Sequence, residues 1–561
     1  MEVARARVHA LVHKLKASCM LLNHISQKKE LFSMHDVVRD VAILIASTEQ
    51  NVFSATNEQV EGYREWSDES AIKLYTSIVL HDIRTNLLPE VVESPQLKLL
   101  FICADQESSS LTIPNKFFER MMQVRVINLT NINLMSLPSS LGLLSNLRTL
   151  SLDNCKLLDI TVVRDLKKLE ILCLRGSNIK MLPIEVSELA RLRLLGLRDC
   201  RELEVIPANV LSNLSHLEEL YIGYNSFGKW EVEMEGVKNA SLHELKHLTS
   251  LELHIKDVNT LPRGLFFPKL QRYKIHIGGY YYAGVWRREL KICPDSKIRL
   301  KDGLIVQLQG IEDLGLSKLP EQDVDYFVNE LAKVGPSQLK HLHIWNHPPN
   351  PAESKALRLC LQLRLYLKSR HLQCQQRREE STDVMQSHEI ILEDNVNALF
   401  VEKVALPKLE NLELDSINVE RIWQSHVAVM SCGSQNLTHL TLYNCMNLRC
   451  LFSSSTVSNN TFVRLQRIEI ENCRVLEELI VVENQEERKN SIVIFPQLQY
   501  LKMDDLEKLR NFCTGDVDIL EFPSFKELII IRCPEFLMRY KRTTNILTEK
   551  SSCQQRNSLT D

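Results

Sequence analysis

The sequence predicts an α/β fold, a solenoid in which short parallel strands line the concave face of a horseshoe, and two observations lead to it. Apolar residues recur in the frame Leu-x-x-Leu-x-Leu-x-x-Cys/Asn-x-Leu. One complete copy consists of Leu147, Leu150, Leu152, Cys155 and Leu157. Successive copies begin 22 to 31 residues apart between Tyr75 and Leu270. This period indicates stacked leucine-rich repeats, each of which buries its apolar side chains only against its neighbours.

Each copy of the frame predicts a strand that is followed by a turn into an outer segment. Alternate residues of the strand point inward, and the last leucine of the frame follows the turn. Prolines come after the strand at similar offsets and end it, because proline cannot donate to a strand ladder. These prolines are Pro138, Pro183, Pro207 and Pro262. A second series of copies runs from Leu409 to Phe525 in steps of 27 to 33 residues, and its units are more variable.

The repeat signal divides the chain into five predicted segments. They are 1–52 ahead of the repeats, a first arc at 53–345, an irregular segment at 346–399, a second arc at 400–540 and a disordered tail at 541–561. The irregular segment joins a turn-rich stretch, a basic apolar stretch and a polar stretch, which we interpret as a loop or hinge. A basic helix on a membrane surface is the alternative for residues 356–370.

Composition favours a soluble protein of the cytoplasm. Hydrophobic residues make up 44% of the chain, charged residues 25%, and the formal net charge is -3, so nothing suggests a nucleic-acid partner. We find no secretory signal and no apolar run near the roughly 20 residues of a transmembrane segment. Fifteen cysteines without a signal peptide fit a reducing compartment.

Several cysteines share the ninth position of the repeat frame, where a small side chain turns inward. They are Cys155, Cys200, Cys445, Cys473 and Cys533. We interpret them as packing residues. A metal site would need closely paired ligands such as Cys-x-x-Cys, and since the sequence contains no such pair, no metal site is predicted.

Residues 1–52 show a different pattern from the repeats. Val8, Leu11, Val12 and Leu15 are spaced for one face of a helix. Two short apolar pairs then flank a polar turn, as in a hairpin. A second helix follows, for which Ser33 is the expected N-cap. Helix, hairpin and helix together predict the end of a winged-helix domain.

The stretch that begins at Met34, His35 and Asp36 reads MHDVVRDVA, which resembles the Met-His-Asp motif of plant intracellular nucleotide-binding leucine-rich-repeat immune receptors of the coiled-coil class. The resemblance covers nearly the whole chain, because leucine-rich repeats follow the motif. It implies that His35 lies against the phosphates of ADP in the resting state, with Asp36 as a supporting neighbour. A helix N-terminus favours phosphate binding. The alternative is that His35 only satisfies a local backbone carbonyl.

The chain is not expected to be an enzyme. It contains no Gly-x-x-x-x-Gly-Lys-Ser/Thr loop to hold a triphosphate, no Gly-x-Ser-x-Gly elbow and no other catalytic constellation, so no catalytic residue is predicted. No cofactor is therefore expected in this chain, and ADP or ATP is expected only together with an upstream module. We interpret the start at Met1 as that of a fragment, a truncated product or a true short product.

Protein-binding residues are expected on the concave sheet, between the buried leucines. Columns that mix arginine with tyrosine have the composition of interface hot spots. The candidates in the first arc are Arg148, Arg175, Arg193, Arg198, Tyr221 and Tyr224, and those in the second arc are Tyr443, Arg467 and Tyr500. The second strip is more acidic than the first, so the two strips are suited to two different partners.

The leading hypothesis is the sensor portion of a plant innate immune receptor. Its early repeats would contact the receptor's own nucleotide-binding module and hold the ADP/ATP switch inactive, and its later repeats would bind a pathogen effector or a guarded host protein. One alternative is the substrate receptor of a ubiquitin ligase, which should carry an F-box ahead of the repeats. Another is a nucleotide-hydrolysing switch whose catalytic half lies upstream.

Overall fold

The computed structural model describes most of the repeat region and the segment that precedes it. The described residues are 2–24, 31–56, 72–83, 88–105, 111–223, 233–234, 237–238, 247–255, 269–278, 288–293, 310–317, 338–345, 398–400, 408–417, 419–423, 434–453, 457, 462–481, 492–513 and 519–536. Two compact units are formed. The first comprises Met1–His276 with Tyr282–Arg287, and the second comprises Ile277–Tyr281 with Arg288–Asp561.

The first unit opens with a helix, a hairpin and a second helix, in the order that the sequence predicts. These elements are α1 (Glu2–Ala17), the antiparallel strands β1 (Leu22–His24) and β2 (Leu31–Ser33), and α2 (Asp36–Glu49). The predicted N-cap was wrong. The cap of α2 is His35 rather than Ser33, because the strand β2 still includes Ser33 and the chain turns into the helix two residues later.

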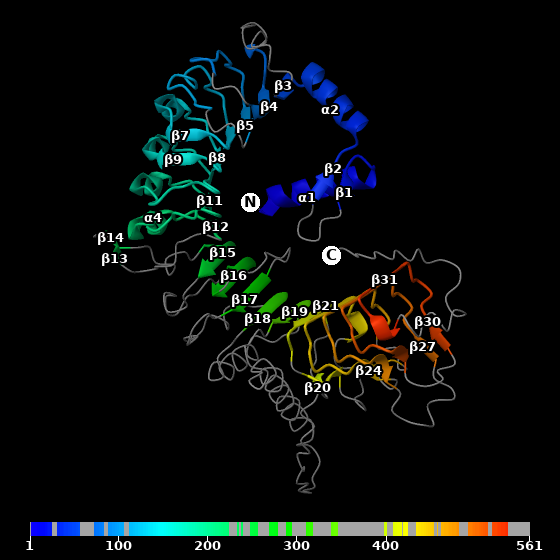
Figure 1. Ribbon diagram of the computed structural model, residues 1–561. Coiled ribbons are helices and arrows are strands. Elements are labelled where there is room, and N and C mark those ends of the chain that lie inside the picture. The colour runs from blue at the N-terminus through cyan, green and yellow to red at the C-terminus, as the bar shows by residue number, and fades with distance from the viewer. Residues whose placement is uncertain are drawn as a thin grey trace, which may run out of the picture. The chain divides into compact units, whose positions relative to one another are not determined.

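The parallel ladder of the first unit contains one strand from each repeat (Figure 1). Its strands are β3 (Val52–Thr56), β4 (Ser77–Ile83), β5 (Leu99–Ala104), β6 (Val126–Thr130), β8 (Thr149–Asp153), β10 (Ile171–Cys173), β11 (Leu194–Gly196), β12 (Glu219–Ile222) and β15 (Ser250–Ile255). Pairing is in register, so that Leu150 lies opposite Leu172 and Leu172 opposite Leu195. A further strand, β16 (Arg272–Gly278), lies where the chain divides into units.

The second unit continues the same construction. Its ladder contains β17 (Arg288–Cys293), β18 (Asp313–Ser317), β19 (His341–Trp345), β21 (Asn411–Asp415), β23 (His439–Tyr443), β25 (Arg467–Glu471), β28 (Tyr500–Asp504) and β31 (Glu527–Ile531). Strand β19 pairs directly with β21, so the sheet does not break at the segment predicted as a hinge. Most of that segment, including residues 356–370, lies outside the described residues, as does the predicted tail.

Short outer elements follow the ladder strands. In the first unit they are β7 (Asn133–Ser136), β9 (Lys156–Asp159), β13 (Glu233–Met234), β14 (Val237–Lys238), the 3₁₀ helices η1 (Ser139–Leu143), η2 (Thr161–Asp165) and η3 (Ile184–Glu188), and α4 (Ala208–Asn213). In the second unit they are β20 (Ala398–Phe400), β22 (Arg421–Trp423), η9 (Ser434–Asn436), β24 (Cys450–Ser453), β26 (Glu478–Val481), β27 (Ile492–Ile494), β29 (Asn511–Cys513) and β30 (Ile519–Glu521). Pro138, Pro183 and Pro207 are the N-caps of η1, η3 and α4, as expected of residues that turn the chain outward.

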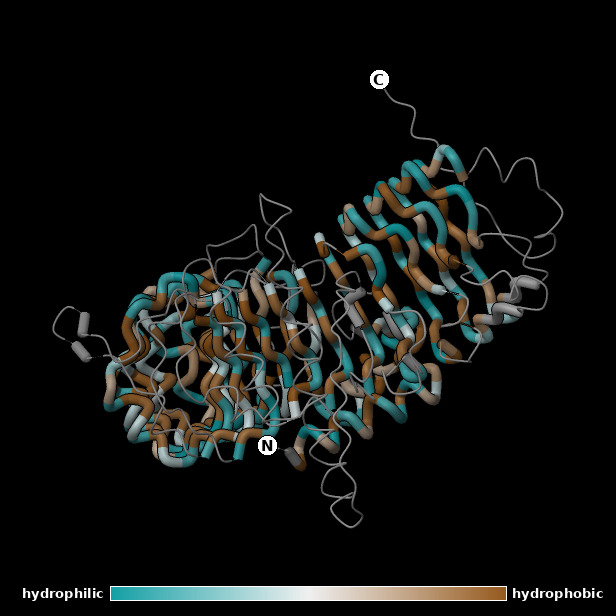
Figure 2. Tube along the Cα trace, turned by 90° about the horizontal axis from the view of Figure 1, so that it is seen from below, coloured by the Kyte–Doolittle hydropathy of each residue, from teal (hydrophilic) through white to brown (hydrophobic). Residues whose placement is uncertain are grey.

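The core of each unit lies between the ladder strands and the outer elements. The frame leucines Leu150, Leu172, Leu195 and Leu220 are fully buried. Apolar residues recur at the same place in successive turns, and polar residues alternate with them (Figure 2). This alternation is the pattern of a strand with one buried face, and it explains why no repeat can bury its core alone.

A tight turn ends most ladder strands and explains the ninth-position cysteines. The residue before that position has a positive φ, for example Asn154, Asp199 and Asn444, and after glycine these short polar residues tolerate this conformation best. The turn directs the next side chain inward. There Cys200 donates through its sulfur to the Leu174 carbonyl of the preceding repeat at 3.0 Å. The cysteines therefore satisfy a buried backbone carbonyl as well as fill space.

Candidate protein-binding surface

The solvent-facing side of the first ladder carries ion pairs between adjacent repeats. Nη1 of Arg148 lies 3.1 Å from a carboxylate oxygen of Glu170, and Nη2 of Arg193 lies 2.6 Å from Glu218. These four residues precede their strands at equivalent positions. The predicted residues Arg148 and Arg193 are thus each paired with a carboxylate of the next repeat.

The predicted residues Arg175 and Arg198 are also paired with carboxylates. Nε of Arg175 lies 3.1 Å from Asp199, and Arg198 pairs with Glu252 of β15. The guanidinium of Arg198 also lies over the ring of Tyr221, 4.5 Å from its centroid. The predicted residue Tyr224 lies outside the described residues. Arginine stacked on tyrosine is a common arrangement at protein interfaces, where both side chains supply contact area.

A contact with the N-terminal helix is the feature that the sequence did not predict. Arg5 of α1 forms an ion pair with Glu219 of β12, and its Nη2 lies 3.1 Å from the hydroxyl of Tyr221. The Tyr221 hydroxyl donates to Glu219 at 2.6 Å, and Nη2 of Arg272 lies 3.4 Å from the same carboxylate. Two arginines and a tyrosine therefore surround one carboxylate, and the side chain of Glu219 has no exposed surface.

The surroundings of Glu219 set its charge state. Burial acts to raise the pKa of Glu219, but the hydrogen bonds from Arg5 and Tyr221 and the charges of Arg5 and Arg272 outweigh it and hold that pKa below its ordinary value. Burial, and then the hydrogen bond to Glu219, raise the pKa of Tyr221. The pair is therefore an arginine with an ionised carboxylate, next to a neutral phenol.

The solvent-facing side of the second ladder carries an acidic surface around Tyr443. Glu413 and Asp415 of β21 and Glu469 and Glu471 of β25 flank β23, which holds Tyr443 between them. Burial, and then these four carboxylates, raise the pKa of Tyr443 to about 12. The phenol is therefore neutral near neutral pH and lies among four carboxylates.

Basic side chains interrupt the acidic surface at one edge. The guanidinium of Arg467 lies over the ring of Tyr500, 3.6 Å from its centroid, and also pairs with Glu469. The ammonium group of Lys502 lies 3.1 Å from Glu471. The predicted residues Tyr443, Arg467 and Tyr500 thus lie on neighbouring strands of one surface.

A second cluster in this unit was missed by the sequence prediction. Lys291 of β17 pairs with Asp313 of β18, and both side chains are almost fully buried. His343 of β19 lies 3.6 Å from Asp313 through Nε2 and 2.7 Å from Glu413 through Nδ1. The only hints in the sequence were charged and histidine residues at solvent-facing strand positions, which usually are only solvated.

A glycine makes room for this cluster. A Cβ atom at Gly315 would lie 2.3 Å from Cδ of Lys291 and 3.0 Å from the Trp345 ring. The Trp345 ring instead stacks on His343, with centroids 5.4 Å apart, and the Lys291 ammonium lies 5.7 Å from its centroid. The absence of a side chain at Gly315 thus lets a charged pair and an aromatic stack share the sheet face.

His35, which the resemblance assigns to ADP, lies at the start of α2. Its Nδ1 accepts a hydrogen bond from the backbone amide of Val37 at 3.3 Å, so this nitrogen already acts as the helix cap. Asp36 is exposed and lies 3.0 Å from the guanidinium of Arg39. The contact is local, as in the alternative left by the sequence, but the partner is a backbone amide and not a carbonyl. Contact with a phosphate stays a prediction.

The described residues contain no group of three or more histidine, cysteine or acidic side chains that could hold a metal ion. Burial raises the pKa of the Cys155 thiol and of the Cys200 thiol to about 12, so neither forms a nucleophilic thiolate near neutral pH. None of the helices in the described parts of the chain is both long and apolar enough to span a membrane.

Comparison with known proteins supports the repeats in both units. Residues 76–284 match the family described as a leucine-rich repeat region, and residues 408–540 match the leucine-rich repeats of plant disease resistance proteins that are RPS2-like. These matches support a plant disease resistance protein with leucine-rich repeats. The predicted solenoid of leucine-rich repeats is confirmed, whereas the winged-helix assignment stays a prediction. Neither family is an enzyme family.

Two curated relatives come from Arabidopsis thaliana. A probable disease resistance protein is 29% identical over 540 residues, which cover 93% of this chain and 52% of the relative. A disease resistance protein is 26% identical over 278 residues, which cover 48% of this chain and 28% of the relative. The chain thus spans about half the length of the first relative and less of the second.

Matches among solved structures have low identities and TM-scores below 0.5. A protein of Leptospira interrogans is 16% identical, with a TM-score of 0.43, over 78% of this chain and 90% of that one. An internalin of Listeria monocytogenes is 14% identical, with a TM-score of 0.39, over 78% of this chain and 88% of that one.

Proposed function

We propose that this leucine-rich-repeat chain is the sensor portion of a plant innate immune receptor of the cytoplasm. In this proposal the first unit holds the segment at its own N-terminus in a resting position. The second unit binds a pathogen effector, or a host protein that the receptor guards, on the acidic surface around Tyr443. Binding there favours a state in which the resting contact is released.

The observation that carries the proposal is the contact of Arg5 with Glu219. It joins the helical segment to the repeat surface over 214 residues of sequence, and its carboxylate is fully buried. A buried ion pair contributes little net stability, but breaking it by removal of one partner is costly. Such a contact is therefore suited to define one resting arrangement that a competing ligand must overcome.

A nucleotide-binding module is the proposed partner of this resting state. About half of the relative that is 29% identical lies outside its match to this chain. The Met-His-Asp motif of this chain begins at Met34. In the proposal His35 reaches a phosphate of ADP through Nε2, while its Nδ1 caps α2. ADP or ATP would be held mainly by that module and not by this chain.

The experiment is a binding assay between this chain and the part of the 29% identical Arabidopsis relative that lies outside the match. The purified parts are mixed with ADP, and association is measured by calorimetry. We expect association that weakens when Arg148, Arg175 and Arg198 are changed to glutamate. If the two parts do not associate, or if these charge reversals leave their affinity unchanged, the resting contact on this surface is rejected.

A further inference from the structure

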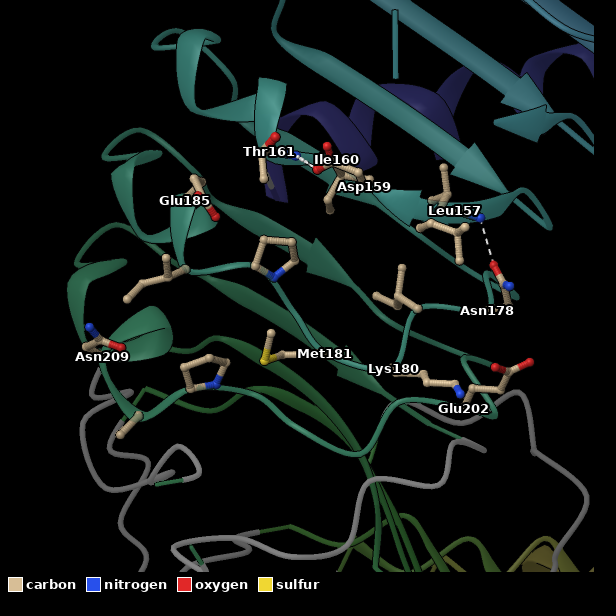
Figure 3. A pocket seen from close by; sticks show the side chains of 16 residues that line it. Leu157, Asp159, Ile160, Thr161, Asn178, Lys180, Met181, Glu185, Glu202 and Asn209 are labelled. Atoms are coloured by element: carbon tan, nitrogen blue, oxygen red, sulfur yellow. Dashed lines mark hydrogen bonds between the residues drawn. The ribbon is translucent and has the colours of Figure 1, made fainter. Parts of the chain in front are cut away.

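A groove lies on the flank of the first unit, away from the solvent-facing side of the ladder (Figure 3). It has a volume of about 920 Å³ and is formed by three successive repeats. Its walls come from the end of β9, from residues 178–185 and from the start of α4. The lining is mainly apolar and includes Leu158, Met181 and Ile184.

These apolar side chains are unusually exposed. The exposed fraction is 67% for Leu158, 50% for Met181 and 50% for Ile184. Met135, which is 59% exposed, extends the same surface, because the register of β7 and β9 places it opposite Leu158. Clustered exposed apolar residues mark interaction sites more often than scattered ones do.

The groove lies where strand pairing on this flank is interrupted. β7 pairs with β9, and Met181 forms a bridge with Val205 in the next repeat. Within the described residues no strand pairing joins β9 to residues 179–181. The link there is one hydrogen bond, from the Leu157 amide to Oδ1 of Asn178 at 2.7 Å. The repeats are therefore spaced apart at this point and leave room for side chains of another molecule.

Charged residues at the rim give the groove a net negative charge. Asp159, Glu185 and Glu202 contribute three carboxylates and Lys180 one ammonium group. Asp159 accepts a hydrogen bond from the Thr161 amide at 2.8 Å. Glu185 and Glu202 form no ion pair with any residue of the described part of the chain. With three carboxylates and one ammonium group, the rim therefore carries a net negative charge.

We propose that this groove binds an amphipathic segment of a partner protein whose apolar side chains are flanked by lysine or arginine. Aliphatic anchors would fill the space over Leu158, Met181 and Ile184, and the basic flanks would meet Glu185 and Glu202. A small apolar ligand fits less well, since such ligands favour enclosed pockets with convergent polar groups, and this groove is open and has its charges at the rim.

The test uses the full chain and a fluorescein-labelled amphipathic helical peptide built from leucine and lysine. Binding is followed by fluorescence anisotropy. Two further peptides have the lysines replaced by glutamate or the residue order scrambled. We expect saturable binding of the lysine peptide only. The double substitution Leu158→Glu with Met181→Glu should weaken it at least about tenfold, the loss expected when one good anchor is removed.

Charge reversal gives a second readout. Glu185→Lys with Glu202→Lys should weaken binding of the lysine peptide and strengthen binding of the glutamate peptide. The controls Met122→Glu and Glu49→Lys change exposed residues outside the groove and should leave both affinities unchanged. In methyl NMR spectra of labelled methionine, the signals of Met135 and Met181 should shift on titration.

Three outcomes would overturn the proposal. One is equal binding of the lysine and glutamate peptides, and another is peptide binding that the groove substitutions do not change. The third is saturable binding of an uncharged apolar dye, lost in the Leu158→Glu and Met181→Glu chain, without binding of any peptide. That result would assign the groove to a small apolar ligand.

Discussion

Arg5 of α1 pairs with Glu219 of β12, a carboxylate with no exposed surface that also contacts Tyr221 and Arg272. This relationship connects the segment that carries the Met-His-Asp motif to the repeat surface within one unit. Every proposal about a resting state depends on it.

Removal of Arg5 should destabilise the first unit. In the Arg5→Ala chain Glu219 keeps Tyr221 and Arg272 but loses its main cationic partner, so we expect a loss of about 1–3 kcal/mol in the free energy of unfolding. Urea denaturation followed by circular dichroism measures this. Arg7→Ala is the matched control, because Arg7 lies on the same helix and is exposed. An equal loss in both chains would show that the pair contributes nothing specific.

The same pair should make stability depend on pH in acid. The pKa of Glu219 in the folded chain lies below its ordinary value of 4.5, so the unfolded chain binds a proton more readily. Its contribution is therefore present above about pH 4.5 and is lost as pH falls through the folded pKa. The free energy of unfolding should fall less steeply below pH 4.5 in the Glu219→Gln chain. If the free energy of unfolding fell equally with pH in the two chains, the lowered pKa assigned to Glu219 would be contradicted.

The ninth-position thiols should be unreactive in the native chain. The pKa values of Cys155 and Cys200 are raised to about 12 by burial, whereas Cys19 is exposed. Iodoacetamide at pH 7.5 followed by peptide mass spectrometry should therefore modify Cys19 well before the other two. In denaturant, which serves as the control, the three cysteines should be modified at similar rates. Rapid modification of Cys155 in the native chain would contradict this prediction, because it would mean that the turn around Cys155 opens.

Gly315 should not tolerate a side chain. Gly315→Ala places a Cβ against Lys291 and the Trp345 ring, and both are held by further contacts, so we expect a loss of about 1–3 kcal/mol in the free energy of unfolding. Thermal or urea unfolding measures it. Gly142→Ala is a milder control, because its nearest contact is a side-chain oxygen of Asp165 at 3.1 Å. Equal stability of both alanine chains would contradict this packing.

The sequence predicted the elements that depend on local periodicity. The frame leucines are buried and the prolines begin the outer helices, because the repeat pattern fixes which side chains face inward. The candidate arginines also lie on the predicted face. What the sequence could not indicate was their pairing, since Arg148 meets Glu170 and Arg198 meets Glu252 only once the register is known.

The features that the sequence did not predict depend on long-range contacts and on small shifts of the backbone. Nothing in the order of residues brings Arg5 to Glu219, because that contact depends on how α1 lies against the ladder. Ser33 was predicted as the cap of α2 because serine favours that position, but β2 extends through Ser33 and the helix begins after His35. The Lys291 cluster needs a glycine on the neighbouring strand, and Gly315 has that role only in three dimensions.

Hydrogen exchange of α1 tests the central claim most directly. Exchange of the amides of residues 3–17 is compared by mass spectrometry in the native chain and in the Arg5→Ala, Glu219→Gln and Arg7→Ala chains. We predict faster exchange of α1 in the first two variants and native exchange in the third, because only the first two remove the pair that holds the helix on the repeats. Identical exchange of α1 in all four chains would contradict the resting contact.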